Sequence, residues 1–147
     1  MRKIYLDVCS LCRQFDDQLY IRIRLETEAV NLILASCQAK MFQLVASPVH
    51  YREIAAIDNL FERIKLEVIL NSKAERIEAD LFSVQQRAEQ LIKNGFGPAD
   101  AAHVAFAESA KADFISCDDK LVKKCLAKKI KVWAGNPIAF SNKELLQ

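Results

Sequence analysis

Short runs of β-branched and aromatic residues recur along this chain, and a longer stretch with helical periodicity separates each run from the next. The runs expected to be strands are residues 3–8, 42–46, 114–116 and 130–133. No hairpin turn signal joins two of them directly. Strands that are separated by helices pair in parallel through right-handed crossovers. The sequence therefore predicts an α/β fold, a three-layer α/β/α sandwich with a mostly parallel central sheet.

Length and composition suit one globular domain. The chain has 147 residues, and residues 1–147 are expected to share a single core. Even the longest uncharged stretches, such as Ala29–Ala39, are too short to cross a bilayer, and the first residues lack the apolar core of a signal peptide. Of the five cysteines, Cys9 and Cys12 form a close pair, without the second pair that a zinc site needs. We expect a cytoplasmic protein with reduced thiols and no membrane segment.

Helices are expected to begin near residues 16, 48, 60, 72, 98 and 119. Residues 20–25 alternate with period two, which favours a strand, but the longer helical pattern that continues to Cys37 favours a helix. The helix over residues 60–70 is expected to turn four apolar side chains toward the core: Leu60, Phe61, Ile64 and Val68. Residues 71–93 are predicted to form one helix, and a turn at residues 135–137 is predicted to precede a polar tail.

Acidic residues occupy unusual places at the ends of these elements. Asp7 lies near the end of the first strand, and Asp118 follows the third strand. Ligands of open α/β sheets bind outside the carboxyl ends of the strands. Asp100 falls in the first turn of a helix that begins at Gly97–Pro98, because Gly suits the cap and Pro the first helical position. Glu53 points within about 40° of the apolar stripe of its helix, where a carboxylate is costly unless it is paired, hydrogen-bonded or metal-bound.

Each of these carboxylates has a simpler explanation when it is taken alone. Asp100 could complement the helix dipole and Asp118 could cap the following helix, each contributing about 0.5–1 kcal/mol. Neither account covers Glu53 or Asp7. Together the four acids predict an oxygen-only site for Mg²⁺ or Mn²⁺, which can activate water and stabilise the leaving oxygen in phosphodiester hydrolysis. Such nuclease chemistry needs no histidine base, so His103 is expected at the helix surface or behind the ligands.

Basic residues cluster locally, although the net charge of +2 is too small to indicate a nucleic-acid binder. Six lysines follow the last acidic pair: Lys120, Lys123, Lys124, Lys128, Lys129 and Lys131. Such clusters are usually solvated faces. The alternative is a rim that contacts RNA phosphates, for which the candidates are Arg13, Lys120 and Lys123.

Four segments together resemble the successive motifs of PIN-domain proteins, most closely the VapC-type toxins of type II toxin–antitoxin systems. The segments are, in order, Tyr5–Asp7, Ser47–Glu53, Asp100–Ala105 and Ser116–Leu121. The resemblance implies a Mg²⁺- or Mn²⁺-dependent ribonuclease that is usually dimeric and is inhibited by a partner antitoxin. It also implies an acidic site with supporting neighbours: Asp7, Glu53, Asp100 and Asp118, supported by Ser116 and Asp119.

Two positions depart from the pattern of that family. Cys9 stands where Thr or Ser often accompanies the first aspartate, and Ser116 stands where Thr is frequent. A serine hydroxyl still donates to a carboxylate, whereas a thiol does so poorly. The alternative function is a PIN-fold module that binds RNA or protein with little catalysis, but the presence of all four carboxylates argues against it. Phosphatase-like chemistry has less support, because the three glycines form no phosphate-binding loop.

Overall fold

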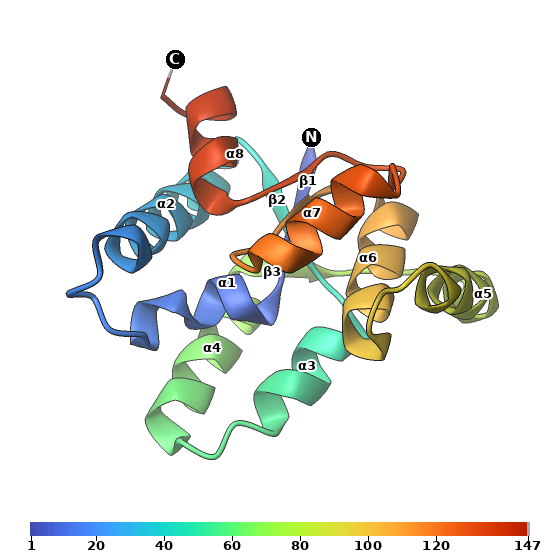
Figure 1. Cartoon of the computed structure of the whole chain (residues 1–147). Helices are drawn as coiled ribbons and strands as arrows, with labels where there is room; N and C mark the ends of the chain where they lie inside the picture. Colours follow the sequence, from blue (N-terminus) through green and yellow to red (C-terminus); the bar gives the residue numbers. More distant parts are fainter. Residues whose placement is uncertain (147) are drawn as a thin grey trace.

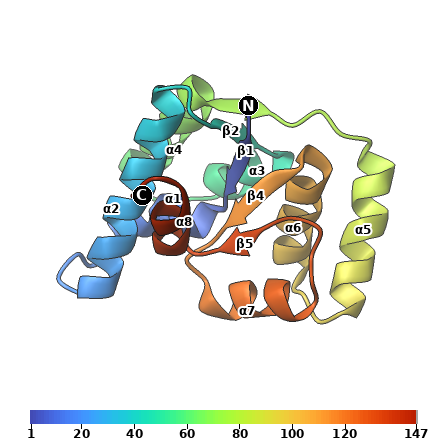
Figure 2. The same ribbon diagram turned by 90° about the horizontal axis from the view of Figure 1, so that it is seen from above.

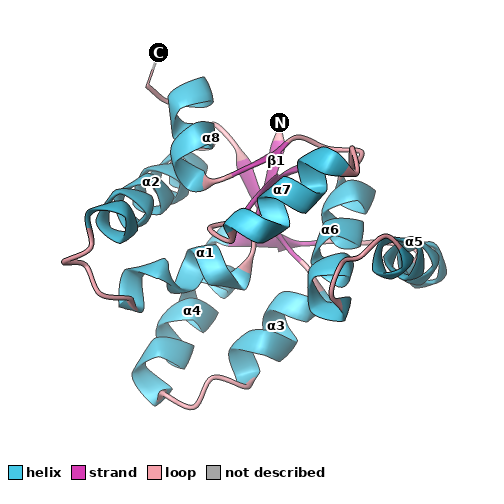
Figure 3. Ribbon diagram, in the orientation of Figure 1, coloured by secondary structure: helices cyan, strands magenta, loops and turns pink. Residues whose placement is uncertain are grey.

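A five-stranded sheet lies at the centre of the protein, and all of its strands are parallel (Figures 1 and 3). The structure is a computed structural model that describes residues 1–146. In the order β3-β2-β1-β4-β5, the strands are Ala74–Arg76, Gln43–Ala46, Lys3–Leu6, Ala112–Ile115 and Ala134–Gly135. This arrangement confirms the predicted α/β class with a parallel central sheet.

Helices cover both faces of the sheet. They are α1 (Val8–Cys12), the 3₁₀ helix η1 (Arg13–Phe15), α2 (Ile21–Gln38), α3 (Pro48–Ala55), α4 (Leu60–Lys73), α5 (Leu81–Lys93), α6 (Pro98–Ala110), α7 (Asp119–Ala127) and α8 (Pro137–Glu144). Helices α5, α6 and α7 pack on one face, and α1, α2, α4 and α8 pack on the other (Figure 2). The three layers are therefore those of the predicted α/β/α sandwich.

Side-chain alternation along β1 divides the core into two halves. Tyr5 points toward α6, whereas Ile4 and Leu6 point to the opposite face and join the side chains of α2 and α4. All three residues have no exposed surface. Strand β1 is thus buried on both faces. Because Asp7 directly follows this strand, its position at the carboxyl edge of the sheet is fixed.

The predicted helix over residues 71–93 is wrong. Helix α4 continues to Lys73, β3 follows at Ala74–Arg76, and α5 starts only at Leu81. Strand β3 pairs in parallel with β2, with Leu44 opposite Ala74. Its three residues are too few to show alternation, and Ala, Glu and Arg favour no strand, so only the pairing with β2 defines it.

Four further boundaries differ from the predictions. The last strand is Ala134–Gly135 rather than residues 130–133, and the predicted polar tail contains α8, whose Phe140 is fully buried. The short helix α1 was not predicted. Helix α2 begins at Ile21 rather than near residue 16, which confirms a helix over most of the alternating segment.

The apolar stripe predicted for α4 does not face the core. Phe61 is 71% exposed, and Leu60, Ile64 and Val68 are also exposed, whereas Leu66 and Leu70 are buried. Helix α4 has two apolar faces, and only one of them packs on the sheet. Among residues 1–146, no helix combines the length and hydropathy that a bilayer crossing requires.

Candidate active site

A cleft of about 300 Å³ opens where β1 ends. Its walls are Asp7, Val8, Cys9, Glu53, Asp100 and His103. They come from the end of β1 and from α1, α3 and α6, and α3 contacts both α1 and α6. The fold therefore brings three of the four predicted acids to one cleft, at the edge of the sheet where the sequence predicted a site.

Asp7 is buried and begins α1. Its Oδ1 accepts the backbone N–H of Ser10 at 2.9 Å. Burial raises the pKa of Asp7, and hydrogen bonds from Ser116 and Ser10 oppose that rise. The carboxylate is thus held in a low-dielectric position by a helix cap and a neighbouring hydroxyl, that of Ser116.

Asp100 lies in the first turn of α6, after the cap residue Gly97, as predicted. No described residue donates a hydrogen bond to it. Its pKa is raised by burial and by the negative charges of Asp118 and Glu53. A carboxylate that is repelled by neighbouring carboxylates and has no donor is poised to accept a cation.

Asp118 caps α7 and stands beside the cleft rather than in its wall. Its Oδ1 accepts the backbone N–H groups of Lys120 at 3.0 Å and Leu121 at 3.2 Å. The capping account is therefore correct for Asp118. Its charge nevertheless reaches Asp100, so the capping role and a contribution to an acidic centre are compatible.

Glu53 reaches the cleft from α3 and is paired with His103. The imidazole Nε2 lies 2.6 Å from Oε1 of Glu53, and this hydrogen bond is the main reason why the pKa of Glu53 is lowered. The side chain of Glu53 is 34% exposed and that of His103 only 4%. The expected surface position for His103 is therefore wrong, and its alternative position behind the acids is confirmed.

Behind His103, buried polar groups continue the hydrogen bonding. The Tyr5 hydroxyl lies 2.5 Å from Nδ1 of His103 and 2.7 Å from the hydroxyl of Ser47. His50 accepts the backbone N–H of Ser47 on Nδ1 at 3.0 Å and donates from Nε2 to the carbonyl of Leu6 at 2.6 Å. Burial and the nearby His103 lower the pKa of His50 to about 4, so this imidazole is neutral.

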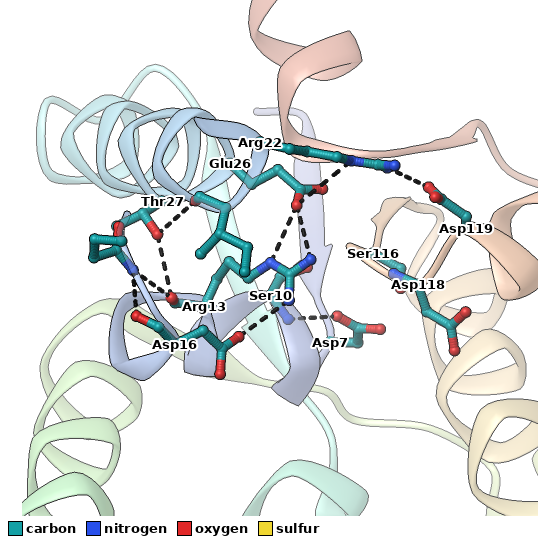
Figure 4. Close-up of polar contacts among 12 residues, drawn as sticks. Asp7, Ser10, Arg13, Asp16, Arg22, Glu26, Thr27, Ser116, Asp118 and Asp119 are labelled. Atoms are coloured by element: carbon teal, nitrogen blue, oxygen red, sulfur yellow. Dashed lines mark hydrogen bonds and ion pairs between the residues drawn. The ribbon is translucent and has the colours of Figure 1, made fainter. Parts of the chain in front are cut away.

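Two other predicted residues, Arg13 and Asp119, form ion pairs with neighbouring side chains (Figure 4). Asp119 pairs with Arg22 of α2 at 2.5 Å, which lowers the pKa of Asp119 and directs it toward α2. Arg13 donates from Nη2 to the fully buried carboxylate of Glu26 at 2.9 Å and from Nη1 to Asp16 at 3.0 Å. An RNA phosphate would have to compete with both acids for Arg13. Lys120 and Lys123 are exposed on α7.

The donor set of the cleft suits an oxygen-preferring cation. Among residues 1–146, no hydrogen-bond donor contacts Asp100, and none contacts the Oε2 atom of Glu53. Mg²⁺ and Mn²⁺ bind through such carboxylate oxygens together with water. In this conformation no three His, Cys, Asp or Glu side chains of residues 1–146 form a closed ligand set. The residues suit the ion because they offer carboxylate oxygens whose charges repel one another. Their present arrangement is not a complete coordination geometry.

Cys9, in place of the expected Thr or Ser, contributes a neutral thiol to the cleft wall. Partial burial and the charge of Asp7 raise its pKa to about 12. All five cysteines are free, as predicted. A protonated thiol is a weak nucleophile, so the chemistry of the cleft rests on its carboxylates.

Comparisons with known proteins bear on the fold. No protein-family model and no curated protein sequence matches this chain. The structure is similar to FitAcB from Neisseria gonorrhoeae, with a TM-score of 0.55, 15% identity and coverage of 91% of this chain and 97% of the other. It is also similar to VapBC2 from Rickettsia felis bound to a promoter DNA fragment, with a TM-score of 0.53, 16% identity and coverage of 91% and 98%. The fold is PIN-like.

Within this PIN-like fold, sequence reasoning missed the polar residues behind Glu53. A signal for two of them was present. The chain has only two histidines; His50 precedes Glu53 by three positions and His103 follows Asp100 by three, which places each on the same helix face as an acid. A glutamate on the buried face of a helix, such as Glu53, needs a hydrogen-bond partner, and these two histidines were the candidates. Tyr5 and Ser47 gave no comparable signal.

Proposed function

We propose that this protein is a Mg²⁺- or Mn²⁺-dependent endoribonuclease, the toxin component of a toxin–antitoxin pair. One observation carries the proposal: Asp7, Glu53 and Asp100 line a single cleft at the carboxyl edge of a PIN-like sheet, with the charge of Asp118 acting on Asp100. The similarity to FitAcB and VapBC2 supports the fold on which this proposal depends.

The acidic residues would hold the metal ion, with Asp7, Glu53 and Asp100 from the cleft wall and Asp118 from beside it. When bound, Mg²⁺ or Mn²⁺ supplies positive charge that lowers the pKa of water and stabilises the leaving oxygen of a phosphodiester. The protein contributes fixed placement: the N-cap bond to Ser10 orients Asp7, and the imidazole of His103 orients Glu53. The neutral Cys9 thiol adds no competing nucleophile.

Substrate binding is proposed to use the basic surface of α7. Lys120 and Lys123 are exposed directly after the Asp118 cap. Lysines attract RNA through its phosphates and carry no sequence information. Arg13 is a weaker candidate for a phosphate contact than these lysines, because Glu26 and Asp16 already accept hydrogen bonds from its guanidinium.

Partner binding is proposed for the apolar faces that the fold leaves uncovered. Leu60, Phe61 and Val68 on α4 are each more than half exposed. Large exposed apolar residues in one patch indicate protein interaction surfaces. We infer that this surface binds an antitoxin or a second copy of this chain. The protein is proposed to act in the cytoplasm.

A second candidate is a PIN-fold module that binds RNA or protein with little catalysis. The observation in its favour is that the acidic side chains of residues 1–146 do not form a closed ligand set. This module would bind RNA with an affinity that is independent of Mn²⁺ and would leave the RNA intact.

A cleavage assay with purified protein separates the two candidates. RNA should be cut in Mg²⁺ or Mn²⁺ and remain intact in excess EDTA. Asp7→Asn keeps the N-cap of α1 but removes a charge, and it should lower the cleavage rate by about a hundredfold or more, comparable to loss of a main electrostatic group of a transition state. Undiminished cleavage in EDTA would refute the metal requirement, and wild-type rates in Asp7→Asn would remove Asp7 from the site.

A further inference from the structure

Glu53 differs from the other acids of the cleft because a buried side chain holds it. We propose that His103 is a positioning residue that fixes the Glu53 carboxylate in the cleft, and that Tyr5 and Ser47 fix the imidazole of His103 in turn. The inference rests on the proposed metal-dependent function of the cleft, and it assigns positioning roles to His103, Tyr5 and Ser47.

The direction of each hydrogen bond follows from donor chemistry. An ionised carboxylate only accepts, so Nε2 of His103 carries the proton that Glu53 Oε1 receives. When Nδ1 of His103 carries no proton it is an acceptor, and the Tyr5 hydroxyl can donate to it. The oxygen of Tyr5 accepts from the Ser47 hydroxyl. Each donor in this chain meets an acceptor, so one arrangement of the imidazole is favoured.

The packing leaves the chain little freedom to rearrange. Tyr5 and Ser47 have no exposed surface, and His103 is 3% exposed. The ring of His103 also lies edge-on to Tyr5, with centroids 5.5 Å apart, and to His50 at 5.2 Å. The imidazole is therefore held by ring contacts as well as by its hydrogen bonds, and it presents Nε2 to the cleft.

Repulsion between carboxylates in the cleft explains why Glu53 needs a residue that holds it in place. The negative charge of Glu53 raises the pKa of Asp100, so the two carboxylates repel each other when no cation is present. Glu53 is 34% exposed and could relieve the repulsion by turning into water. The bond from His103 opposes that movement through Oε1. Among residues 1–146 no group donates to Oε2, which is therefore left for the cation.

Variants of His103 and Tyr5 test this positioning role by Mn²⁺ binding, followed through the electron paramagnetic resonance signal of free Mn²⁺. His103→Leu removes the donor, and Tyr5→Phe removes only the hydroxyl. Each should weaken Mn²⁺ binding by about 10- to 100-fold, as loss of groups that orient metal ligands does. His103→Gln keeps an N–H donor and should bind Mn²⁺ more tightly than His103→Leu. Leu66→Ala changes a buried residue of α4; it is the matched control for general destabilisation and should keep wild-type affinity.

The outcomes separate this inference from the function on which it rests. Equal Mn²⁺ affinities in wild type, His103→Leu and Tyr5→Phe would overturn the positioning role alone. Weakening in Leu66→Ala equal to that in His103→Leu would also overturn it, because the effect would then reflect stability. Wild-type protein that binds no Mn²⁺ would overturn the proposed function and the inference together. In metal-free wild type, ¹⁵N-edited NMR should show a proton on Nε2 of His103, and its absence would contradict the bond to Glu53.

Discussion

Glu53 and Asp100 line the same cleft, yet their pKa values move in opposite directions. The hydrogen bond from His103 lowers the pKa of Glu53, whereas burial and the charges of Asp118 and Glu53 raise that of Asp100. Glu53 has a hydrogen-bond donor, whereas for Asp100 burial and the charges of neighbouring acids outweigh the opposing charges of His103 and Lys124. The ionised form of Asp100 is therefore disfavoured in the metal-free cleft, and a bound cation would favour it.

Asp100→Asn tests this imbalance. A carboxyl whose pKa is raised in the folded state contributes most stability below its unfolded pKa, and that contribution is lost as the pH rises through the folded pKa. At pH 7 the charged Asp100 thus destabilises the metal-free protein, and Asp100→Asn should raise Tm in EDTA by about 1–3 °C. The increase of Tm in millimolar Mn²⁺ should become smaller, because the metal binds more weakly.

The opposite result has a defined meaning. If Asp100 acted only on the dipole of α6, Asp100→Asn would lower the stability by about 0.3–1 kcal/mol with or without metal. A lower Tm of Asp100→Asn in EDTA, together with an undiminished increase of Tm in Mn²⁺, would show that Asp100 only stabilises the start of α6. Thermal melts of both proteins under both conditions give the answer.

His50 predicts a pH dependence of stability. Its pKa is about 4 in the folded protein, below the ordinary value of 6.5. As the pH falls from 6.5 toward 4, the unfolded chain gains a proton that the folded protein excludes, so stability decreases over this window. One pKa unit corresponds to about 1.4 kcal/mol, and we expect a loss of about 1–3 kcal/mol.

Urea unfolding at pH 7, 6 and 5 measures this effect, with His50→Gln as the comparison. The variant lacks the titrating ring, so its free energy of unfolding should fall less between pH 7 and 5 than that of wild type. Asp7 and Asp100 have raised pKa values and shift stability the other way near the acid end, but they are present in both proteins. Equal pH slopes would show that His50 is not buried as a neutral imidazole.

At the scale of elements, the sequence correctly predicted features that depend on a few adjacent residues, such as the starts of helices. Gly97 and Pro98 marked the start of α6, and Asp118 marked the cap of α7, because caps depend on a few adjacent residues. Strand β3 could not be predicted, since its existence depends on pairing with β2. The hydrogen bond between Tyr5 and His103 joins residues 98 positions apart, and such a contact follows only from the assembled sheet and α6.

Helix α4 provides the test of which apolar face is buried. Phe61 is 71% exposed, whereas Leu66 is fully buried. Phe61→Gln should change the free energy of unfolding by about 0.5 kcal/mol or less, as expected for a surface position. Leu66→Ala should cost about 2–5 kcal/mol, since it leaves a cavity beneath the helix. Denaturant unfolding of the two variants compares them directly, and a larger loss in Phe61→Gln would restore the face that the sequence pattern favoured.

At the scale of the whole molecule, the acids of the cleft wall and the candidate phosphate-binding lysines lie on different elements. The carboxylates gather in a cleft at the carboxyl edge of the parallel sheet, while Lys120 and Lys123 lie on the exposed surface of α7. The net charge is only +2, so long-range attraction of the proposed RNA substrate would be weak and local contacts would have to supply the affinity. Ion pairs such as Arg22–Asp119 and Arg13–Glu26 remove further cations from this role.

The salt dependence of RNA binding therefore reports which lysines touch phosphate. Each phosphate neutralised on a single strand contributes about 0.7 to the slope of log K against log salt concentration. Lys120→Gln and Lys123→Gln should each weaken binding to single-stranded RNA and reduce that slope by about 0.7, without moving the cleavage sites. Lys40→Gln is the control, because Lys40 is exposed in the turn before β2, at the opposite edge of the sheet. A changed cleavage-site preference with an unaltered slope would show that these lysines read bases rather than phosphates, and an equal loss of slope in Lys40→Gln would show that RNA senses only the net charge of the protein.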